Sequence, residues 1–497
     1  MMNHAVINGT SSSRQTETLA CREMPTDALL PQLSVILDPE AMKNRLQEQV
    51  FESVQERERF RILSCEIDRV RYKPESSCMV TYRLEIEDRA TRETGDQILC
   101  GRAYPDGRSQ SQWEKARARA MVQPRFGKPV VYLPNLEMVL WSFPNDRKMD
   151  TLPILADSGH FTSAILPKVL ASHLGEDWTL IGATRTLVHY VGEHTCTVRI
   201  DATVAHQDDH RRQTITLFEK TYYNGEGEET FQIMHQLWQS GARRSGQLVI
   251  AMPVWYDSSL KTLWQLGFKG TPFGSCDVYG SEFLPSFEEA ARRLATLHVT
   301  PIACKRSTTV ADLVADLKRV IPALIRLRPS CASTLRPLVN RLLAQAEQMP
   351  EEPRATLHGD LHLQNLFIGE THVALIDLDN VRTGSPLLDI GSLIAGLHYV
   401  RILQRTSPES CQRLVERFLQ TYQANVPWAV LPSILNWYAA VALITERAYR
   451  CVTQIKPGRL NLIDDLVVLA SQITCEAEQV NPAIEHHVFS NGGLHVG

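Results

Sequence analysis

The sequence has no run of about 18 uninterrupted apolar residues, which is the length that a transmembrane helix needs. It has no Cys-x-x-Cys pair among its 11 cysteines, and it has no long Lys/Arg run. The formal net charge is −4. These absences argue against a membrane protein and against a nucleic-acid-binding protein. Scattered single cysteines are typical of reduced core residues in a cytoplasmic protein.

The two ends of the chain have the pattern of disordered tails. Residues 1–26 are polar and contain no apolar core of a signal peptide, so we expect a disordered tail there and a second tail over residues 486–497. A chain of 497 residues is too long for one core. We therefore expect two or three domains of ordinary globular composition, since 43% of the residues are hydrophobic.

Polar residues that suit phosphoryl transfer cluster near residue 360. The chain reads Leu-His-Gly-Asp-Leu-His-Leu-Gln-Asn from Leu357, and Ala-Leu-Ile-Asp-Leu-Asp follows from Ala374. Asp360 lies five residues before the amide of Asn365, and Asp377 ends an apolar stretch. Transfer of a phosphoryl group to a hydroxyl uses one carboxylate to deprotonate the acceptor, and an amide oxygen with a second carboxylate to hold Mg²⁺.

The spacing of these residues allows them to meet. Residues 366–368 and 373–376 are short apolar stretches, and the turn-rich segment 369–372 separates them. A hairpin of this size returns Asp377 to the side of the loop that carries Asp360 and Asn365. Mg²⁺ takes oxygen ligands from few protein groups and the rest from phosphate and water. The alternative interpretation is a buried polar loop in an unrelated α+β protein.

The pattern His-Gly-Asp-x-x-x-x-Asn followed by Ile-Asp-x-Asp resembles the aminoglycoside phosphotransferase and choline kinase-like family, which has a protein-kinase-like fold. The resemblance implies that Asp360 is the catalytic base and that Asn365 and Asp377 are metal ligands. It also implies that His358 braces the loop. His298, in Leu-Ala-Thr-Leu-His, and Asp389, in Pro-Leu-Leu-Asp-Ile-Gly, fit the same pattern.

An internal repeat precedes these motifs. Tyr, Glu, Cys and Val recur at an offset of 118 residues between segments 71–80 and 189–198. The same offset relates segments 101–107 and 219–225. Each copy has the pattern of turn, strand, polar hairpin, strand and tight Asp-Gly or Asn-Gly turn, followed by a helix and a Pro-containing strand. The fold class expected is therefore α+β and protein-kinase-like, with two tandem β-rich N-lobe-like units followed by a mainly helical C-lobe.

The resemblance implies that a strand Lys holds the α- and β-phosphates and that a helix Glu pairs with it. Lys220 occupies that place in the second copy, and Arg102 occupies it in the first. Because Arg and Lys are not interchangeable at such a site, we expect one active site, built from the second copy. The alternative for Lys220 is a solvated lysine. Glu226, Glu228 and Glu229 are the candidate partners, and we favour Glu229.

The expected organisation is a degenerate unit at 27–160, an active N-lobe with its hinge at 161–280, and a catalytic helical lobe at 281–485. The expected function is ATP- and Mg²⁺-dependent phosphorylation of a small hydroxyl compound, such as a sugar, aminosugar, aminoglycoside or amino alcohol. The alternative is an inactive kinase-like binding or regulatory module. A protein acceptor is disfavoured, because the 377–389 segment is too short for a peptide-docking loop.

The sequence does not choose among acceptors, between ATP and GTP, or among oligomeric states. A cationic acceptor would need acidic or aromatic walls. The candidates are Trp437, Tyr438, Glu446 and Tyr449, although aromatic residues at helical spacing are more often core residues. His362 either contacts the acceptor or braces the loop. Asp379 either reaches a second ion or solvates the end of its strand.

Overall fold

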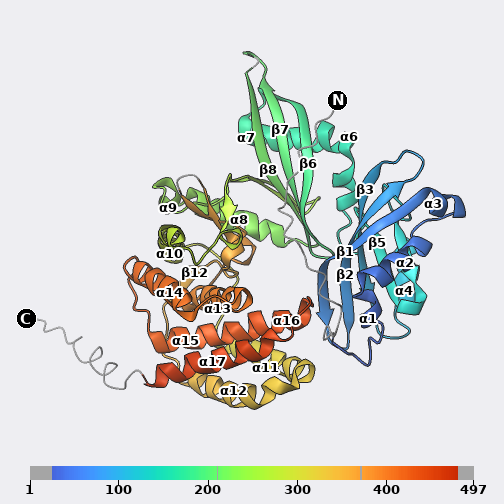
Figure 1. Cartoon of the computed structure of the whole chain (residues 1–497). Coiled ribbons are helices and arrows are strands. Elements are labelled where there is room, and N and C mark those ends of the chain that lie inside the picture. The colour runs from blue at the N-terminus through green and yellow to red at the C-terminus, as the bar shows by residue number, and fades with distance from the viewer. Residues whose placement is uncertain (1–24, 210, 370–371, 480–497) are drawn as a thin grey trace, which may run out of the picture.

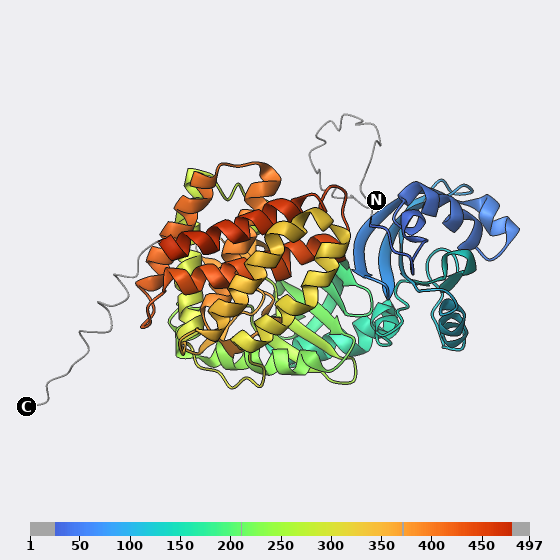
Figure 2. The same ribbon diagram turned by 90° about the horizontal axis from the view of Figure 1, so that it is seen from below.

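The computed structural model describes residues 25–209, 211–369 and 372–479, and its fold is α+β (Figure 1). Two five-stranded antiparallel sheets follow each other along the chain, and a mainly helical region follows them. Seen from below, the first sheet and its helices lie to one side of the helical region, next to the second sheet (Figure 2). The predicted tails at residues 1–26 and 486–497 lie outside the described residues, except for residues 25 and 26.

The first sheet has the strand order β1-β2-β3-β5-β4. Its strands are β1 (Phe60–Lys73), β2 (Ser77–Asp88), β3 (Thr94–Ala103), β4 (Val130–Leu133) and β5 (Met138–Ser142), after helices α1 (Leu33–Ile36), α2 (Pro39–Gln49) and α3 (Val54–Arg59). Helix α2 packs on β1 and β4, and α4 (Ser109–Arg117) packs on β4 and β5. Successive side chains of a strand point to opposite faces. Accordingly, Leu140 joins the core that contains α2, and Val139 and Trp141 join a small cluster with Ala116 of α4.

The second sheet has the equivalent order, β6-β7-β8-β10-β9. Its strands are β6 (Trp178–Val191), β7 (Thr195–His206), β8 (Arg212–Tyr222), β9 (Pro253–Asp257) and β10 (Thr262–Leu266). The helices around it are α5 (Leu152–Ala156), α6 (Ser158–His160), α7 (Leu166–Leu174), α8 (Glu226–Gln239) and α9 (Gly241–Arg244). Helix α7 packs on β6 and β9, as α2 does on β1 and β4, and α8 packs on β8, β9 and β10.

The predicted repeat is confirmed at the level of strand pairing. Cys78 pairs with Ala103 in the first sheet, and Cys196 pairs with Thr221 in the second, so both partners are shifted by 118 residues. The turns before β2 and β7 also match, because Glu75 and Glu193 both have positive φ, at 59° and 61°. The offset is larger at the third pairing of each sheet, between β3 and β5 and between β8 and β10. Val139 opposite Arg102 corresponds to Leu263 opposite Lys220, an offset of 124 residues.

The helical region surrounds three short strand pairings. Its helices are α10 (Leu284–Val299), α11 (Val310–Leu327), α12 (Ala332–Glu347), α13 (Leu387–Gln404), α14 (Pro408–Gln423), α15 (Pro432–Ala442), α16 (Tyr449–Thr453) and α17 (Leu462–Gln479). Its strands are β11 (Thr271–Pro272), β12 (Ala355–Leu357), β13 (Leu366–Ile368), β14 (Val373–Leu375) and β15 (Arg382–Gly384). A π-helical turn, η8 (Leu443–Ala448), joins α15 to α16. Helix α11 begins at a capping box, in which Thr309 and Asp312 each accept a hydrogen bond from the other's backbone N–H.

The first sheet also contacts the helical region. Strand β1 packs against α16, and Arg326 of α11 forms an ion pair with Glu75 at 2.5 Å. Helix α8 lies between the second sheet and the helical region (Figure 1) and packs against the turn η7 (Leu378–Asn380). The second sheet and the helical lobe therefore meet at the segment that carries Asp377. No helix within the described residues is long and apolar enough to span a membrane.

Candidate active site

The loop after β12 is fixed by buried hydrogen bonds. Asp389, at the start of α13, is fully buried and accepts hydrogen bonds from the backbone N–H of His358 at 2.6 Å and of Gly359 at 2.9 Å. Its Oδ2 also lies 3.1 Å from His298 Nε2. Burial opposes ionisation of this carboxyl, but His298 outweighs burial and lowers the pKa of Asp389. Gly359 has φ of +78°, and a Cβ there would overlap the carbonyl oxygen of Asn380, so the loop requires glycine at this position.

His358 connects this loop to the strand that precedes Asp377. Its side chain is fully buried, and Nε2 donates a hydrogen bond to the carbonyl oxygen of Ile376 at 2.9 Å. Ile376 in turn donates its backbone N–H to the Asn365 carbonyl at 3.1 Å. These contacts hold the two motifs side by side. They suit a residue that positions the loop, which is the role predicted for His358.

Asp360 and Asn365 lie together at the end of the loop. Asn365 Nδ2 donates to the Asp360 carbonyl oxygen at 3.0 Å, and Asn365 is only 5% exposed. The Asp360 carboxylate is more open, and its nearest charged neighbours are His362 Nε2 at 3.8 Å and Arg450 Nη2 at 3.6 Å. Burial lowers the pKa of His362, and the Asp360 charge opposes that effect only in part.

The predicted hairpin is confirmed. Strands β13 and β14 are antiparallel, and Leu366 pairs with Leu375. Residues 370 and 371 of the predicted turn lie outside the described residues. Asp377 follows the hairpin with φ of 59° and ψ of 63°, a left-handed conformation that is uncommon for a residue other than glycine. Such conformations persist where the surrounding structure holds them, and they concentrate at functional sites.

Lys220 of β8 reaches this hairpin from the second sheet. Its Nζ lies 2.7 Å from Asp377 Oδ1 and 2.6 Å from Asp379 Oδ2. The hydroxyl of Tyr222 donates to Asp379 Oδ1 at 2.8 Å. Burial opposes the charge of the lysine, but the two carboxylates outweigh burial and raise the pKa of Lys220. Burial likewise opposes ionisation of Asp377, but Lys220 lowers the pKa of that carboxyl.

The expected pairing of Glu229 with Lys220 is not formed. Glu229 lies in the first turn of α8, and its carboxylate lies 3.4 Å from Arg306 Nε. Arg306 Nη1 donates to the carbonyl oxygen of Asp379 at 2.5 Å. Glu229 therefore reaches the Asp377–Asp379 segment through an arginine. The physical reason is that Asp377 and Asp379 already occupy hydrogen-bonding positions around the ammonium group.

The donor set suits Mg²⁺. Asn365 Nδ2 is engaged with the Asp360 carbonyl, which leaves Oδ1 to serve as an oxygen ligand, and the Asp377 side chain is 39% exposed toward the cleft. Hard cations prefer such oxygen ligands, and Mg²⁺ typically uses one or two protein carboxylates together with phosphate and water. Within the described ranges, no three His, Cys, Asp or Glu side chains form a metal-binding group by themselves.

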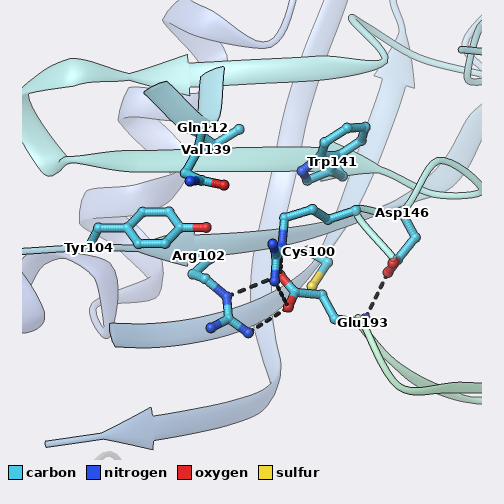
Figure 3. A pocket seen from close by; sticks show the side chains of 9 residues that line it. Cys100, Arg102, Tyr104, Gln112, Val139, Trp141, Asp146 and Glu193 are labelled. Carbon is cyan, nitrogen blue, oxygen red and sulfur yellow. Dashed lines mark hydrogen bonds and ion pairs between the residues drawn. The ribbon is translucent and has the colours of Figure 1, made fainter. Parts of the chain in front are cut away.

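The equivalent cation in the first sheet is paired with a protein carboxylate. Arg102 donates to Glu193 through Nε at 3.0 Å and Nη2 at 2.6 Å, and Arg147 donates to the same carboxylate at 2.7 and 2.6 Å (Figure 3). Arg102 and Arg147 thus share Glu193. Arg102 and Glu193 line two cavities, one of about 10 Å³, which is space for about one water molecule, and one of about 230 Å³. Glu193 belongs to the β6–β7 turn, so the second sheet supplies the partner of Arg102.

Two of the four expected acceptor walls are core residues, and the other two are partly buried. Trp437 and Tyr438 are 1% and 4% exposed, and they donate to the Leu342 carbonyl and to Glu352. Glu446 accepts a hydrogen bond from Ser392 at 2.7 Å. Tyr449 stacks beneath Arg319, whose guanidinium lies 5.3 Å from the ring centroid.

The sequence prediction missed several basic residues around the cleft. Arg450 lies beside Asp360, and Arg69 Nη2 of the first sheet lies 2.5 Å from His189 Nε2 of the second. Arg447 and Arg450 are about one helical turn apart in the sequence, and this spacing is the signal that could have identified Arg450. Nothing in the sequence places Arg69 at this cleft, because the approach depends on how the two sheets pack.

Comparison with known proteins agrees with this geometry. Residues 199–431 match the model of the phosphotransferase enzyme family. The resemblance inferred from the motifs is therefore confirmed, and the matched segment contains Lys220, Asp360, Asn365 and Asp377. No curated protein sequence matches the chain.

Solved structures that match are kinase-like phosphotransferases. The aminoglycoside phosphotransferase APH(3'')-Id from Streptomyces rimosus is 16% identical, with 56% of this chain and 97% of that chain covered and a TM-score of 0.38. The choline kinase LicA from Streptococcus pneumoniae is 13% identical, with 63% and 98% covered and a TM-score of 0.39. A thermostable mutant of APH(4)-Ia, solved with ADP and hygromycin B, is 12% identical, with 66% and 99% covered and a TM-score of 0.40.

Proposed function

We propose that the protein transfers the γ-phosphate of ATP to a hydroxyl group of a small molecule, with Mg²⁺ as the metal cofactor. The family match supports a phosphotransferase. The observation that carries the proposal is the approach of Lys220 Nζ to within 2.7 Å of Asp377, a residue 157 positions later in the chain. A cation from the second sheet and an anion from the helical lobe thereby lie side by side, and an ATP-Mg²⁺ site needs both.

The residues divide the work as follows. The ammonium of Lys220 binds the α- and β-phosphates, and Asn365 and Asp377 hold Mg²⁺. The metal, when bound, neutralises charge on the phosphates. Asp360 orients the acceptor hydroxyl and takes its proton, and His358 positions the loop. Glu229 supports the site through Arg306, which bonds to the Asp379 carbonyl.

Two units of the chain contribute different parts of this proposed site. The unit at 161–280 supplies the nucleotide cation and the hinge, and the unit at 281–485 supplies the base and the metal ligands. Nucleotide binding replaces existing contacts, because Lys220 is already paired with Asp377 and Asp379. Lys220 would bind the phosphates, and the Asp377 carboxylate would then be free to hold the metal.

The test is transfer of labelled phosphate from ATP to a panel of sugars, aminosugars, aminoglycosides, amino alcohols and their acidic derivatives. Asp360→Asn should lower turnover by roughly two to four orders of magnitude, the usual effect of losing a positioned base. ATP affinity should stay near that of the wild type. Asp316→Asn, at an exposed position of α11, is the matched control and should behave as wild type.

Two results would count against the proposal. Wild-type turnover by Asp360→Asn would remove this residue as the base. ATP binding without transfer to any acceptor, and without ATP hydrolysis, would favour the alternative of an inactive nucleotide-binding module.

A further inference from the structure

Another cavity lies beside the catalytic loop, on the side of the helical lobe. Its volume is about 210 Å³, which is room for a compact molecule and far more than one water. It is lined by Tyr399, Arg447, Arg450, Cys451, Gln454, Lys456 and Arg459. Four of these side chains are cationic and none is acidic. Tyr399 comes from α13, and the others come from η8, from α16 and from the connection before α17.

The cavity adjoins the proposed base. Arg450 lines it and at the same time lies 3.6 Å from Asp360 Oδ1. A molecule whose hydroxyl group approaches Asp360 would therefore extend past Arg450 into this space. The cavity is in the right place to hold the acceptor, and the side chains around it set the charge that the acceptor must carry.

The cations of the cavity have few anionic partners. Arg447 is buried, with Nη2 bonded to the Ser392 carbonyl at 2.9 Å and 3.4 Å from Glu446. Its Nε has no hydrogen-bond partner within the described residues. Burial lowers the pKa of Arg447, the charge of Glu446 opposes that effect only in part, and the charge of Arg450 adds to it. A buried N–H without a partner is unfavourable, so a bound anion would be favoured here.

The far side of the cavity is also positive. Arg459 Nη1 donates to the Tyr399 hydroxyl at 2.6 Å, which fixes the guanidinium in place. In the part of the chain that the structure describes, neither Arg459 nor Lys456 forms an ion pair. Arg69 of the first sheet lies close enough to Arg450 for the charges of the two residues to interact, although Arg69 does not line the cavity.

We propose that the acceptor is an anion: a hydroxyl compound that carries a phosphate or carboxylate group. Lys456 and Arg459 bind the anionic group, Arg450 lies between it and the reacting centre, and the hydroxyl points to Asp360. This inference rests on the proposed phosphotransferase function. Like charges repel, so aminoglycosides and amino alcohols, which are cationic, are disfavoured as acceptors.

Binding of simple anions tests the charge of the cavity without knowledge of the acceptor. The full-length protein is first saturated with a non-hydrolysable ATP analogue and Mg²⁺, which occupies the nucleotide site. Inorganic phosphate is then titrated by calorimetry. We expect the wild type to bind phosphate, and Lys456→Glu and Arg459→Met each to weaken that binding at least tenfold. Lys318→Glu, an exposed change on α11, is the charge-matched control and should leave it unchanged.

The outcomes separate the inference from the proposed function. Loss of phosphate binding in the cavity variants with unchanged affinity for the ATP analogue supports the inference. Phosphate binding that Lys456→Glu and Arg459→Met leave unchanged overturns it. Equal weakening of phosphate and ATP analogue also overturns it, because the cavity would then belong to the nucleotide. If the wild type binds no ATP analogue, the proposed function fails, and the phosphate titration still reports on the cavity.

Acetate and phosphate titrations distinguish the two possible anionic groups. Tighter binding of phosphate identifies a phosphorylated acceptor, and tighter binding of acetate identifies a carboxylated one. In the transfer assay, a higher kcat/KM for an amine-bearing compound than for the acidic compound of the same carbon skeleton, such as glucosamine compared with glucuronate, would contradict the inference.

Discussion

The two five-stranded sheets place a cation at the same register position but give it different partners. Lys220 on β8 meets Asp377 and Asp379 of the helical lobe, whereas Arg102 on β3 meets Glu193 from the turn of the neighbouring sheet. The strand order and the pairing register are shared. The difference between the two sites therefore comes from the element that faces each sheet, and not from the sheet itself.

The turns that begin β2 and β7 show the same contrast. Glu75 and Glu193 have matching backbone conformations. The Glu75 side chain is 58% exposed and pairs with Arg326, but the Glu193 side chain is 6% exposed and bridges Arg102 and Arg147. Asp146 accepts hydrogen bonds from the Glu193 backbone N–H and from the Tyr190 hydroxyl, which seats the turn in the first sheet. The first sheet thus positions the turn that precedes β7 of the second.

The largest expected difference between the sheets is in catalysis. Lys220→Met should lower phosphate transfer by about 10²–10³-fold, because a desolvated site loses the cation that stabilises phosphate charge. Arg102→Met should change transfer by less than about threefold, since its partner Glu193 retains Arg147. Initial rates at saturating ATP measure both. Similar losses in the two variants would mean that Arg102 takes part in catalysis.

The second difference concerns the metal. Asp377→Ala should raise the Mg²⁺ concentration for half-maximal activity by at least about tenfold, because it removes the only charged protein ligand in the proposed set. Asp146→Ala, which removes the carboxylate beside Glu193, should leave that concentration unchanged. A Mg²⁺ titration of each variant decides the point, and an unchanged requirement in Asp377→Ala would remove this residue from the metal site.

The third difference is in stability. Glu193→Gln leaves two partly buried arginines without their anion and should lower the free energy of unfolding by about 3 kcal/mol. Glu75→Gln, at the equivalent position, breaks an exposed pair and should cost about 1 kcal/mol or less. Gln keeps the side-chain size and the left-handed backbone in both cases. Denaturant melts compare the two, and equal losses would show that the buried bridge contributes no more than the exposed pair.

The smallest effect is a pH dependence that only the second sheet should have. Glu219 is buried where the first sheet has Gly101, and burial, only partly opposed by Arg185, raises the pKa of Glu219 to about 7. The folded state therefore binds this proton more tightly than the unfolded state, whose carboxyl titrates near the ordinary value of about 4.3. Stability from this group is present at low pH and is lost as pH rises through about 7.

Glu219→Gln should remove that dependence. The melting temperature of the wild type relative to Glu219→Gln should fall by roughly 1–3 °C between pH 5 and pH 8. Thermal melts at both pH values measure it. A constant or rising difference would mean that Arg185 keeps the Glu219 carboxylate ionised throughout.

The sequence predicted those parts of the molecule that depend on local pattern. The hairpin between Asn365 and Asp377 and the 118-residue repeat follow from strand alternation and turn residues, and both are confirmed. The roles of Asp360, Asn365, Asp377, His358 and Lys220 stay predictions, although the contacts of these residues suit them.

The sequence did not predict how the units pack against one another. The partner of Lys220 was expected on α8, but it comes from the segment after β14, because proximity in the folded chain decides which carboxylate pairs. The aromatic residues of α15 were candidate acceptor walls, but helical spacing does not distinguish a core face from a cavity face. The cationic cavity draws on α13, η8 and the loop before α17, and these segments have no common sequence motif.

The central claim is that the chain has one nucleotide site, at Lys220. Calorimetric titration of ATP at fixed Mg²⁺ concentration tests it most directly. The account predicts one ATP per wild-type chain, unchanged affinity in Arg102→Met, and affinity weakened at least about tenfold in Lys220→Met, which loses a charge-assisted contact to phosphate. Two ATP molecules per chain, or equal loss of affinity in the two variants, would show that both sheets bind nucleotide and would contradict the single-site account.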